Sequence, residues 1–588
     1  MGLPPFFSRV ADALRPVTDV DPAVLASKLS DVTVELHLPD MTDTSAVRDA
    51  ALMAGNLLAR LYPTLEVHAA PASSLAREVA ALAKTINPDI GLIIVDASGT
   101  ADVEFEDASA TSSSQTDAGA LGRQTSATNG TRVALVIGWR AQVQSNEDER
   151  PRTGVPPQVP SGRVVHVNAS GWVATVDHAE DESVEASPVP GTPLAWLAAA
   201  ALGVGEMFRA VFADELGSRG RHHAQPGRLS MLPGTAATAV PDGGPPQSED
   251  PRLSARGIDI GHVHLAGAGA IGEAFALALR ASEATGRLTV VEPETVTLSN
   301  LQRYVLTDAA SVDVPKGEII RNLFAGSDVS VEIEEARWGD RSSHLGVQKV
   351  AVALDSARDR IAVTSTLPQA AYNAWTQVAD LGWSRHEDFG TAPCLACLYY
   401  PTTARPSDHE LIAAAIGQPT LRVLGYLVYN QPIGFPLPHV PAIPDLPANQ
   451  EDVLHWIQVP LIDDLLAAGV INEEERDRWA ASTVGALYRD GVCAGGVLPV
   501  GNLPGEVLVP LAHQSALAGF MLAAEVLTAS EELRGERDAA VERRFDVLRG
   551  FPQVIARPRE RTPGCLCSDP DYVRGAIRLR RPPQTTDS

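Results

Sequence analysis

A glycine-rich turn between a predicted strand and a predicted helix constrains the fold of this chain more than any other feature. The turn lies in HVHLAGAGAIGEAFALAL, where Gly267, Gly269 and Gly272 form a G-x-G-x-x-G pattern. Glycines at these positions permit a tight turn and a close approach of the backbone to a ligand, and the free amides at a helix start attract a phosphate. The pattern predicts a nucleotide-binding α/β unit.

A carboxylate follows at the end of the next predicted strand. Glu292 closes the strand RLTVVE, where a carboxylate can accept hydrogen bonds from ribose hydroxyls, as in dinucleotide-binding folds. These features alone are compatible with NAD, FAD or ATP.

Two cations beyond this strand favour ATP. Arg303 and Lys316 lie in LSNLQRYVLTDAASVDVPK. They suit nucleotidyl transfer, because charge then grows on the α-phosphate and on the departing pyrophosphate. Asn300 can bind a phosphate oxygen or order Arg303, and Asp355, after the predicted strand in VAVALDSARDR, can hold Mg²⁺. A nicotinamide or flavin enzyme would leave the two cations without a clear role.

The run LTVVEPETVTLSNLQRYVLTDAASVDVPK, with the glycine loop before it and ALDSARDR after it, resembles the adenylation domain of the ThiF/MoeB/ubiquitin-activating enzyme superfamily. The resemblance covers about residues 255–400 and resumes over about 490–570, which include DGVCAGGVLPVGNLPGEVLVPLAHQSALAGFMLAAEVL. It implies a Rossmann-like α/β domain with a mixed sheet.

The resemblance also implies roles for single residues. Glu292 stands where the family usually has a ribose-binding aspartate, and Asp355 matches its Mg²⁺ aspartate. Asn300, Arg303 and Lys316 match its phosphate-contacting residues.

Some positions depart from the family pattern. Glu292 replaces aspartate, Tyr304 replaces glutamine and Ser356 replaces asparagine, whereas Arg360 fits the arginine that follows the Mg²⁺ aspartate. The departures leave the catalytic charges in place. They also leave open a second reading, a nucleotide-binding scaffold or pseudoenzyme without turnover.

The first half of the chain has the same α/β rhythm without the site. Its predicted strands cover 31–38, 65–70, 90–96 and 132–139, and it lacks a glycine pattern, an Arg/Lys cluster and cysteine. We therefore predict three segments: a degenerate, inactive adenylation-like domain (1–234), a linker (235–257) and a ThiF-type domain (258–588) with an insertion at about 401–490.

Two alanine-rich segments bear on this division. PLAWLAAAALGVGEMF near the end of the first half resembles PLAHQSALAGFMLAAEVL near the end of the second. The similarity reflects either two copies of a related fold or simply two amphipathic helices. Because relatives dimerise or fuse two copies, the resemblance implies a homodimer or an intrachain pseudo-dimer.

Four of the five cysteines form two close pairs. Cys394 and Cys397 lie in APCLACLYYP, and Cys565 and Cys567 lie in TPGCLCSDP. Four thiolates suit a structural, tetrahedral Zn²⁺, which would fix the C-terminal segment to the core; the alternative is four reduced structural cysteines. The family often has two C-x-x-C pairs, whereas the second pair here is the tighter C-x-C.

The fifth cysteine, Cys493 in YRDGVCAGGVLP, has two possible roles. As a thiolate it could take an acyl group from an adenylate, as in family members that activate ubiquitin-like proteins. As a free cysteine it could equally be a small buried hydrophobic residue.

The charge and the apolar runs exclude some partners. A formal charge of −26 argues against binding to nucleic acid. The apolar run at 193–204 is too short to cross a bilayer, and the first ten residues lack a signal-peptide core. We expect a cytoplasmic protein with no membrane partner.

The reaction implied by the resemblance is adenylation with ATP and Mg²⁺. Its substrate would be the C-terminal carboxylate of a small ubiquitin-like or sulfur-carrier protein, or of a peptide, ending in Gly-Gly. Transfer of the acyl group to a thiol would be a further step.

Overall fold

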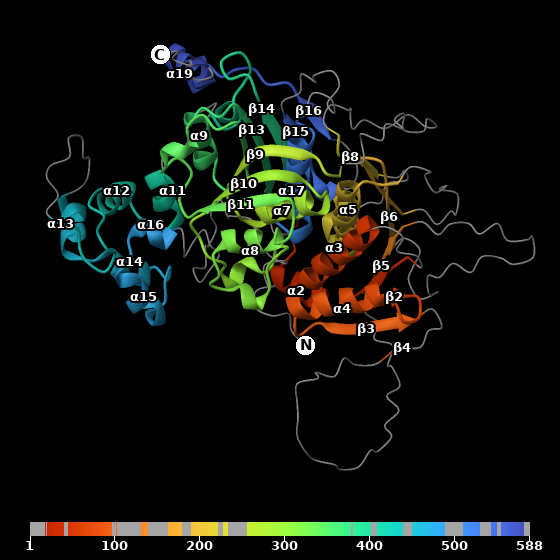
Figure 1. Cartoon of the computed structure of the whole chain (residues 1–588). Coiled ribbons are helices and arrows are strands. Elements are labelled where there is room, and N and C mark those ends of the chain that lie inside the picture. Colours follow the sequence, from red (N-terminus) through yellow and green to blue (C-terminus); the bar gives the residue numbers. More distant parts are fainter. Residues whose placement is uncertain are drawn as a thin grey trace, which may run out of the picture. The chain divides into compact units, whose positions relative to one another are not determined.

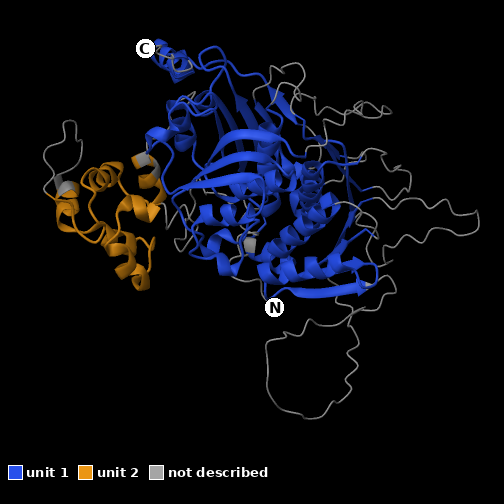
Figure 2. Ribbon diagram, in the orientation of Figure 1, with its two compact units in different colours: residues 1–400, 509–588 blue, residues 401–508 orange. Residues whose placement is uncertain are grey.

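The chain folds into two compact units. The computed structural model describes residues 18, 20–39, 45–96, 101–102, 131–138, 163–178, 190–220, 227–232, 256–377, 380–400, 408–438, 450–488, 510–529, 542–549 and 554–580. Residues 1–400 and 509–588 belong to the first unit, and residues 401–508 form the second (Figure 2). Most of the predicted linker and Cys493 lie outside the described residues.

The first unit contains two mixed sheets (Figure 1). The first sheet has the order β4-β3-β2-β1-β5-β6-β7-β8. Its strands are β1 (Val32–His37), β2 (Thr64–Ala69), β3 (Gly91–Asp96), β4 (Ala101–Asp102), β5 (Thr131–Ile137), β6 (Val164–Ser170), β7 (Val173–Asp177) and β8 (Gly227–Ser230).

The second sheet has the order β11-β10-β9-β12-β13-β14-β15-β16. Its strands are β9 (Asp259–Ala266), β10 (Thr285–Val291), β11 (Val329–Glu334), β12 (Lys349–Val352), β13 (Ala370–Gln377), β14 (Asp380–His386), β15 (Glu542–Phe545) and β16 (Ile555–Arg557). The predicted α/β class with a mixed sheet is confirmed.

The helices of the first unit follow the strands in chain order. They include α2 (Pro22–Ser30), α3 (Ser45–Leu61), α4 (Ser74–Ile86), α5 (Pro193–Val211), α6 (Ala213–Leu216), α7 (Ala270–Ala281), α8 (Lys316–Leu323), α9 (Ala357–Ser365), α10 (Leu395–Tyr399), α17 (Ala512–Leu527) and α19 (Pro570–Arg580).

The two sheets share one topology. In the first, β3, β2, β1, β5 and β6 run parallel and β7 and β8 are antiparallel additions. In the second, β11, β10, β9, β12 and β13 run parallel and β14, β15 and β16 are antiparallel additions. Helix α3 follows β1 as α7 follows β9, and α5 precedes β8 as α17 precedes β15. The shared place of α5 and α17 agrees with the similarity of their sequences.

Helices from the two halves pack together in the middle of the first unit. Helix α17 contacts α7, α5 and α3, and α5 contacts α3. The helices approach closely because of glycine: a Cβ on Gly519 of α17 would lie 2.5 Å from the Cβ of Ala274 on α7. The four helices thus form one shared core.

Helix α5 explains its own unusual composition. Thr192 caps it by accepting a hydrogen bond from the Ala195 N–H (3.2 Å), and Pro193 occupies its first turn, where its missing N–H costs nothing. Among the described residues it is the one helix whose length and apolarity would suffice to cross a membrane, yet it is buried along its whole length. Its position in the core accounts for its hydrophobicity.

The second unit is helical. Its helices are α11 (Asp408–Ala415), α12 (Thr420–Val428), α13 (Gln450–Gln458), α14 (Leu461–Ala467), α15 (Arg476–Ala480) and α16 (Val484–Ala486). They enclose an apolar core of their own, which includes Tyr426 and Trp479.

Candidate nucleotide site and cysteine cluster

Three predicted site segments meet at one edge of the second sheet. Strand β9 ends directly before Gly267, β10 ends directly before Glu292, and β12 ends three residues before Asp355. Because β10, β9 and β12 are parallel neighbours, their carboxyl ends share an edge. The chain leaves β9 toward β10 on one side and later returns to β12 on the other. Such a switch point is where open α/β sheets bind ligands.

The glycine loop requires its glycines. Gly267 has a φ of 94°, which disfavours residues with a side chain. A Cβ on Gly272 would lie 2.3 Å from the carbonyl oxygen of Gly267. Gly269 is the N-cap of α7 and has no capping side chain, so the first amides of this helix remain available to an anion.

Glu292 holds the glycine loop in place. One oxygen of its carboxylate accepts the Ala268 N–H (2.8 Å), and the other accepts the Glu294 N–H (3.0 Å). Burial raises the pKa of Glu292, although Lys316 and these two donors partly oppose the shift. Because a carboxylate has about four acceptor sites, these bonds leave room for the predicted ribose contact.

Lys316 is a buried cation at the start of α8. Its side chain is 6% exposed, and its Nζ donates to Glu294 (2.6 Å), whose side chain is 65% exposed. Burial alone lowers the pKa of Lys316, but Tyr304, Glu292 and Glu294 together raise it above its usual range. Lys316 therefore stays charged at neutral pH.

Tyr304 connects the cations to the glycine loop. Its ring centre lies 5.4 Å from Lys316 Nζ and 5.8 Å from the guanidinium carbon of Arg303. Its hydroxyl would lie 3.3 Å from a Cβ on Gly269. The structure thus brings Lys316, Arg303 and the glycine loop around one aromatic ring.

Arg303 presents an unpaired nitrogen to this region. Its Nη1 is buried and has no hydrogen-bond partner among the residues that the structure describes. Buried donors are nearly always paired in folded proteins, so such a nitrogen indicates a missing acceptor. An anion such as a phosphate suits a guanidinium in this setting.

Asn300 orders the turn that carries Arg303. Its side-chain oxygen accepts the Thr297 N–H (2.9 Å), and its carbonyl accepts the Arg303 N–H (3.0 Å). The hydrogen bonds therefore favour the ordering role over direct contact with a phosphate.

Asp355 is exposed just beyond β12. Buried Arg360 fixes the segment before it, donating to the Leu354 carbonyl (2.9 Å), to Asn373 (3.0 Å) and to Tyr399 (2.6 Å). Among the described residues, Asp355 belongs to no group of three potential metal ligands. A single carboxylate is still enough for Mg²⁺ that is held mainly by nucleotide phosphates and water.

Glu273 is a site residue that no pattern in the sequence predicts. It lies on the first turn of α7, is fully buried, and accepts the Leu306 N–H (2.7 Å). Burial raises its pKa to about 8, against the opposing effects of the Leu306 N–H, Arg60 and Lys316. It connects the glycine-loop helix to the segment that contains Arg303.

Helix α3 of the first half binds the same segment from the other side. Arg60 donates to the carbonyls of Leu301 and Thr307 (2.7 Å for Thr307), and Asn56 donates to the carbonyl of Val305 (2.8 Å). Arg60 also donates to Asn56 (2.8 Å). An Asn and an Arg one turn apart in an otherwise apolar stripe were the available signal for these contacts.

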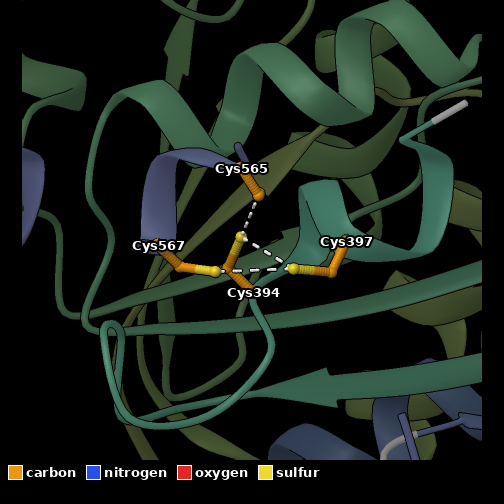
Figure 3. Close-up of side chains that lie close together, drawn as sticks. All are labelled: Cys394, Cys397, Cys565 and Cys567. Atoms are coloured by element: carbon orange, nitrogen blue, oxygen red, sulfur yellow. Dashed lines mark hydrogen bonds between the residues drawn. The ribbon is translucent and has the colours of Figure 1, made fainter. Parts of the chain in front are cut away.

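The two cysteine pairs converge as predicted (Figure 3). Sγ of Cys394 lies 3.9 Å from that of Cys397 and 3.4 Å from that of Cys565, and Cys397 lies 3.4 Å from Cys567. A tetrahedral Zn²⁺ with bonds of about 2.3 Å separates its sulfur ligands by about 3.8 Å. The four buried thiols fit such an ion despite the tighter C-x-C pair.

Comparisons with known proteins agree with this site. The ThiF family matches residues 255–565. The uncharacterized protein y4jF of Sinorhizobium fredii (strain NBRC 101917 / NGR234) is 29% identical over 588 residues, which cover 97% of this chain and 96% of that protein.

Two solved structures show more distant similarity. E. coli MccB with MccA-N7isoASN is 13% identical with a TM-score of 0.30, over 53% of this chain and 67% of that one. E. coli tRNA N6-threonylcarbamoyladenosine dehydratase, TcdA, in complex with ATP is 22% identical with a TM-score of 0.16, over 18% of this chain and 45% of that one. The family match spans a little over half of the sequence and confirms the resemblance seen in its motifs. The chain belongs to the ThiF family.

Proposed function

We propose that the second half of this chain activates a carboxylate with ATP by adenylation. The unpaired Nη1 of Arg303, next to buried Lys316 and the amides of the glycine loop, is the observation that carries the proposal. A carboxylate oxygen of the substrate attacks the α-phosphorus, the bond from that phosphorus to the bridging oxygen breaks, and pyrophosphate leaves.

The charged residues have separate roles in this reaction. Lys316 and Arg303 stabilise the negative charge that grows on the phosphates, and they do so more strongly because they are partly or wholly shielded from water. Mg²⁺ on Asp355, when bound, would neutralise the departing pyrophosphate. Glu292 and Asn300 act by fixing the glycine loop and the Arg303 turn.

The proposed substrate is the C-terminal carboxylate of a small ubiquitin-like or sulfur-carrier protein, or of a peptide. Membership of the ThiF family supports this class of substrate. Cys493, or a thiol on a partner, would then take the acyl group. The reaction would take place in the cytoplasm, without nucleic acid or membrane.

In the same proposal, the first half is an inactive partner domain that completes an intrachain pseudo-dimer. The shared strand order of the two sheets supports it, as do the hydrogen bonds from Arg60 and Asn56 to the nucleotide half. Its inactivity follows from the lack of a glycine pattern in its sequence.

ATP–pyrophosphate exchange with a panel of proteins and peptides ending in Gly-Gly tests the function. We expect exchange with at least one member, and Arg303→Ala should lower it about 100-fold, because one charged donor to the phosphates is lost. Arg287→Ala is the matched control, since this arginine is 54% exposed and only 4.0 Å from Glu332. ATP binding without exchange for every candidate, or full exchange by Arg303→Ala, would favour a nucleotide-binding scaffold.

A second test concerns the proposed structural Zn²⁺ at the four cysteines. Cys565→Ser should lose the thiolate-bound ion, since one of four ligands is gone. The loss should also expose the C-terminal segment to trypsin, because that segment is joined to Cys394 and Cys397 through the ion. Metal analysis and timed proteolysis measure both effects, with Cys493→Ser as the control that keeps the ion. Protein that carries no metal and resists trypsin equally in both variants would contradict the zinc assignment.

A further inference from the structure

The first half has its own cluster of potential ligands at the edge that corresponds to the nucleotide site. Glu35 and His37 lie on β1, and His68 lies on β2 directly opposite His37. Strand β1 lies between β2 and β5, as β9 lies between β10 and β12. The cluster therefore occupies the switch point of the first sheet, at the carboxyl ends of its strands.

The backbone makes the correspondence specific. The N–H of Leu38, just after β1, donates to the carbonyl of His68 (2.8 Å). The N–H of Gly267, just after β9, donates in the same way to the carbonyl of Val291 (3.1 Å). Where the second half begins its glycine loop, the first half presents two histidines.

The donor atoms of the cluster converge on one carboxylate oxygen. Oε2 of Glu35 lies 3.0 Å from Nε2 of His37 and 3.6 Å from Nε2 of His68. The three ligand atoms lie within 4.8 Å of one another. Oε2 of Glu66 adds a further oxygen 3.5 Å from Nε2 of His68. Two ligands bound to one Zn²⁺ at about 2.0–2.1 Å in tetrahedral geometry are about 3.4 Å apart, so these separations are close to those of a bound ion.

Arg132 divides the carboxylate of Glu35 into two sides. It donates to Oε1 (2.9 Å) and also pairs with Glu66. Oε2, on the other side, faces the two imidazoles. An outer partner that fixes one oxygen of a carboxylate and leaves the other to an ion is typical of metal sites.

An ion-pair network without metal is the simpler explanation, and it leaves one feature unexplained. Arg132 and His37 account for both oxygens of Glu35. Nε2 of His68, however, is buried without a hydrogen-bond partner among the described residues. Two carboxylates and one guanidinium also give the cluster a net negative charge when the imidazoles are neutral, which favours a cation.

We propose that Glu35, His37 and His68 bind a divalent transition-metal ion, with Zn²⁺ as the ion to test and Glu66 as a further oxygen ligand. Imidazole nitrogen with carboxylate oxygen is the donor set that proteins use for zinc and for other first-row ions. The site is separate from the cysteine cluster and from the nucleotide site. The inference does not depend on the proposed adenylation.

Cobalt substitution of the full-length chain can separate the two metal sites. The protein is stripped with a chelator and titrated with Co²⁺, which gives sulfur-to-cobalt charge-transfer bands only at thiolate ligands. We expect one ion per chain with these bands and a second ion with visible ligand-field bands alone. His68→Gln should lose the second ion and keep the first, since one of the nitrogen ligands is gone.

Matched variants make the outcome clear. His262→Gln is the control, because this histidine lies on β9 and pairs with Thr289 (2.9 Å) away from any ligand cluster. His37→Gln replaces His68→Gln if that variant fails to fold by circular dichroism. Uptake of the thiolate-bound ion alone by the wild-type chain at micromolar Co²⁺ and Zn²⁺, or two ions retained by both glutamine variants, would overturn the proposal.

Discussion

Replacing Lys316 by methionine is expected to lower ATP–pyrophosphate exchange about 1,000-fold, at the upper end of the effect of one preorganised donor in an active site. Methionine keeps an apolar stem against Tyr304 and removes only the charge. Lys316 is 6% exposed, so its charge acts with little screening by water, whereas half-buried Arg303 acts through more. The loss should therefore exceed that of Arg303→Ala.

The control for this variant is another lysine of the same sheet. Lys349 lies on β12, at the end opposite to the nucleotide site, and donates to the Ile260 carbonyl (3.0 Å). Lys349→Met should keep wild-type exchange. Calorimetric titration with ATP separates binding from turnover. Exchange by Lys316→Met within a few-fold of wild type would remove Lys316 from the catalytic machinery.

The parts of this site that could be predicted from the sequence are those that local geometry determines. The glycine loop depends on a strand, a turn and a helix within twenty residues. Glu292 and Asp355 follow directly from the ends of predicted strands, because parallel strands place their carboxyl ends together. Each of these inferences needs only the periodicity of a short segment.

The remaining contacts depend on tertiary structure. Arg60 donates to the carbonyls of Leu301 and Thr307, which are 241 and 247 residues away in sequence. Backbone carbonyls have no sequence signature, so no motif could indicate these bonds. The pairing of His37 with His68 likewise depends on strand register, which a shift of one residue would destroy.

Tyr304 shows how a departure from a family pattern acquires meaning in three dimensions. In the sequence it is only an unusual residue between Arg303 and the rest of the loop. In the structure its ring lies near both cations and its hydroxyl lies against Gly269. Its effect on the geometry of phosphate binding follows from this position.

Replacing Arg60 by methionine is expected to destabilise the first unit by about 3–5 kcal/mol, the usual cost of removing one member of a buried charged network. Arg60 is fully buried, and its loss leaves two carbonyls and the Asn56 oxygen without a donor. Burial lowers the pKa of Arg60 to about 10, which still leaves it charged at neutral pH. Urea unfolding followed by tryptophan fluorescence measures the change.

Arg48→Met is the matched control for this prediction. Arg48 lies on the same helix and pairs with Glu78, but its side chain is 47% exposed, so its loss should cost less than about 1 kcal/mol. Equal destabilisation by the two variants would contradict the anchoring role of Arg60.

The Arg60 variant also tests whether the first half serves the nucleotide site. Glu273 faces Arg60, and without that charge its pKa, already about 8, should rise further, so Glu273 becomes protonated and no unpaired negative charge remains. The main loss then falls on the segment from Leu301 to Thr307. Hydrogen exchange of its amides should accelerate in Arg60→Met and stay unchanged in Arg48→Met. If the segment keeps its protection while stability falls, Arg60 contributes to the core alone, and the first half does not order the residues around Arg303.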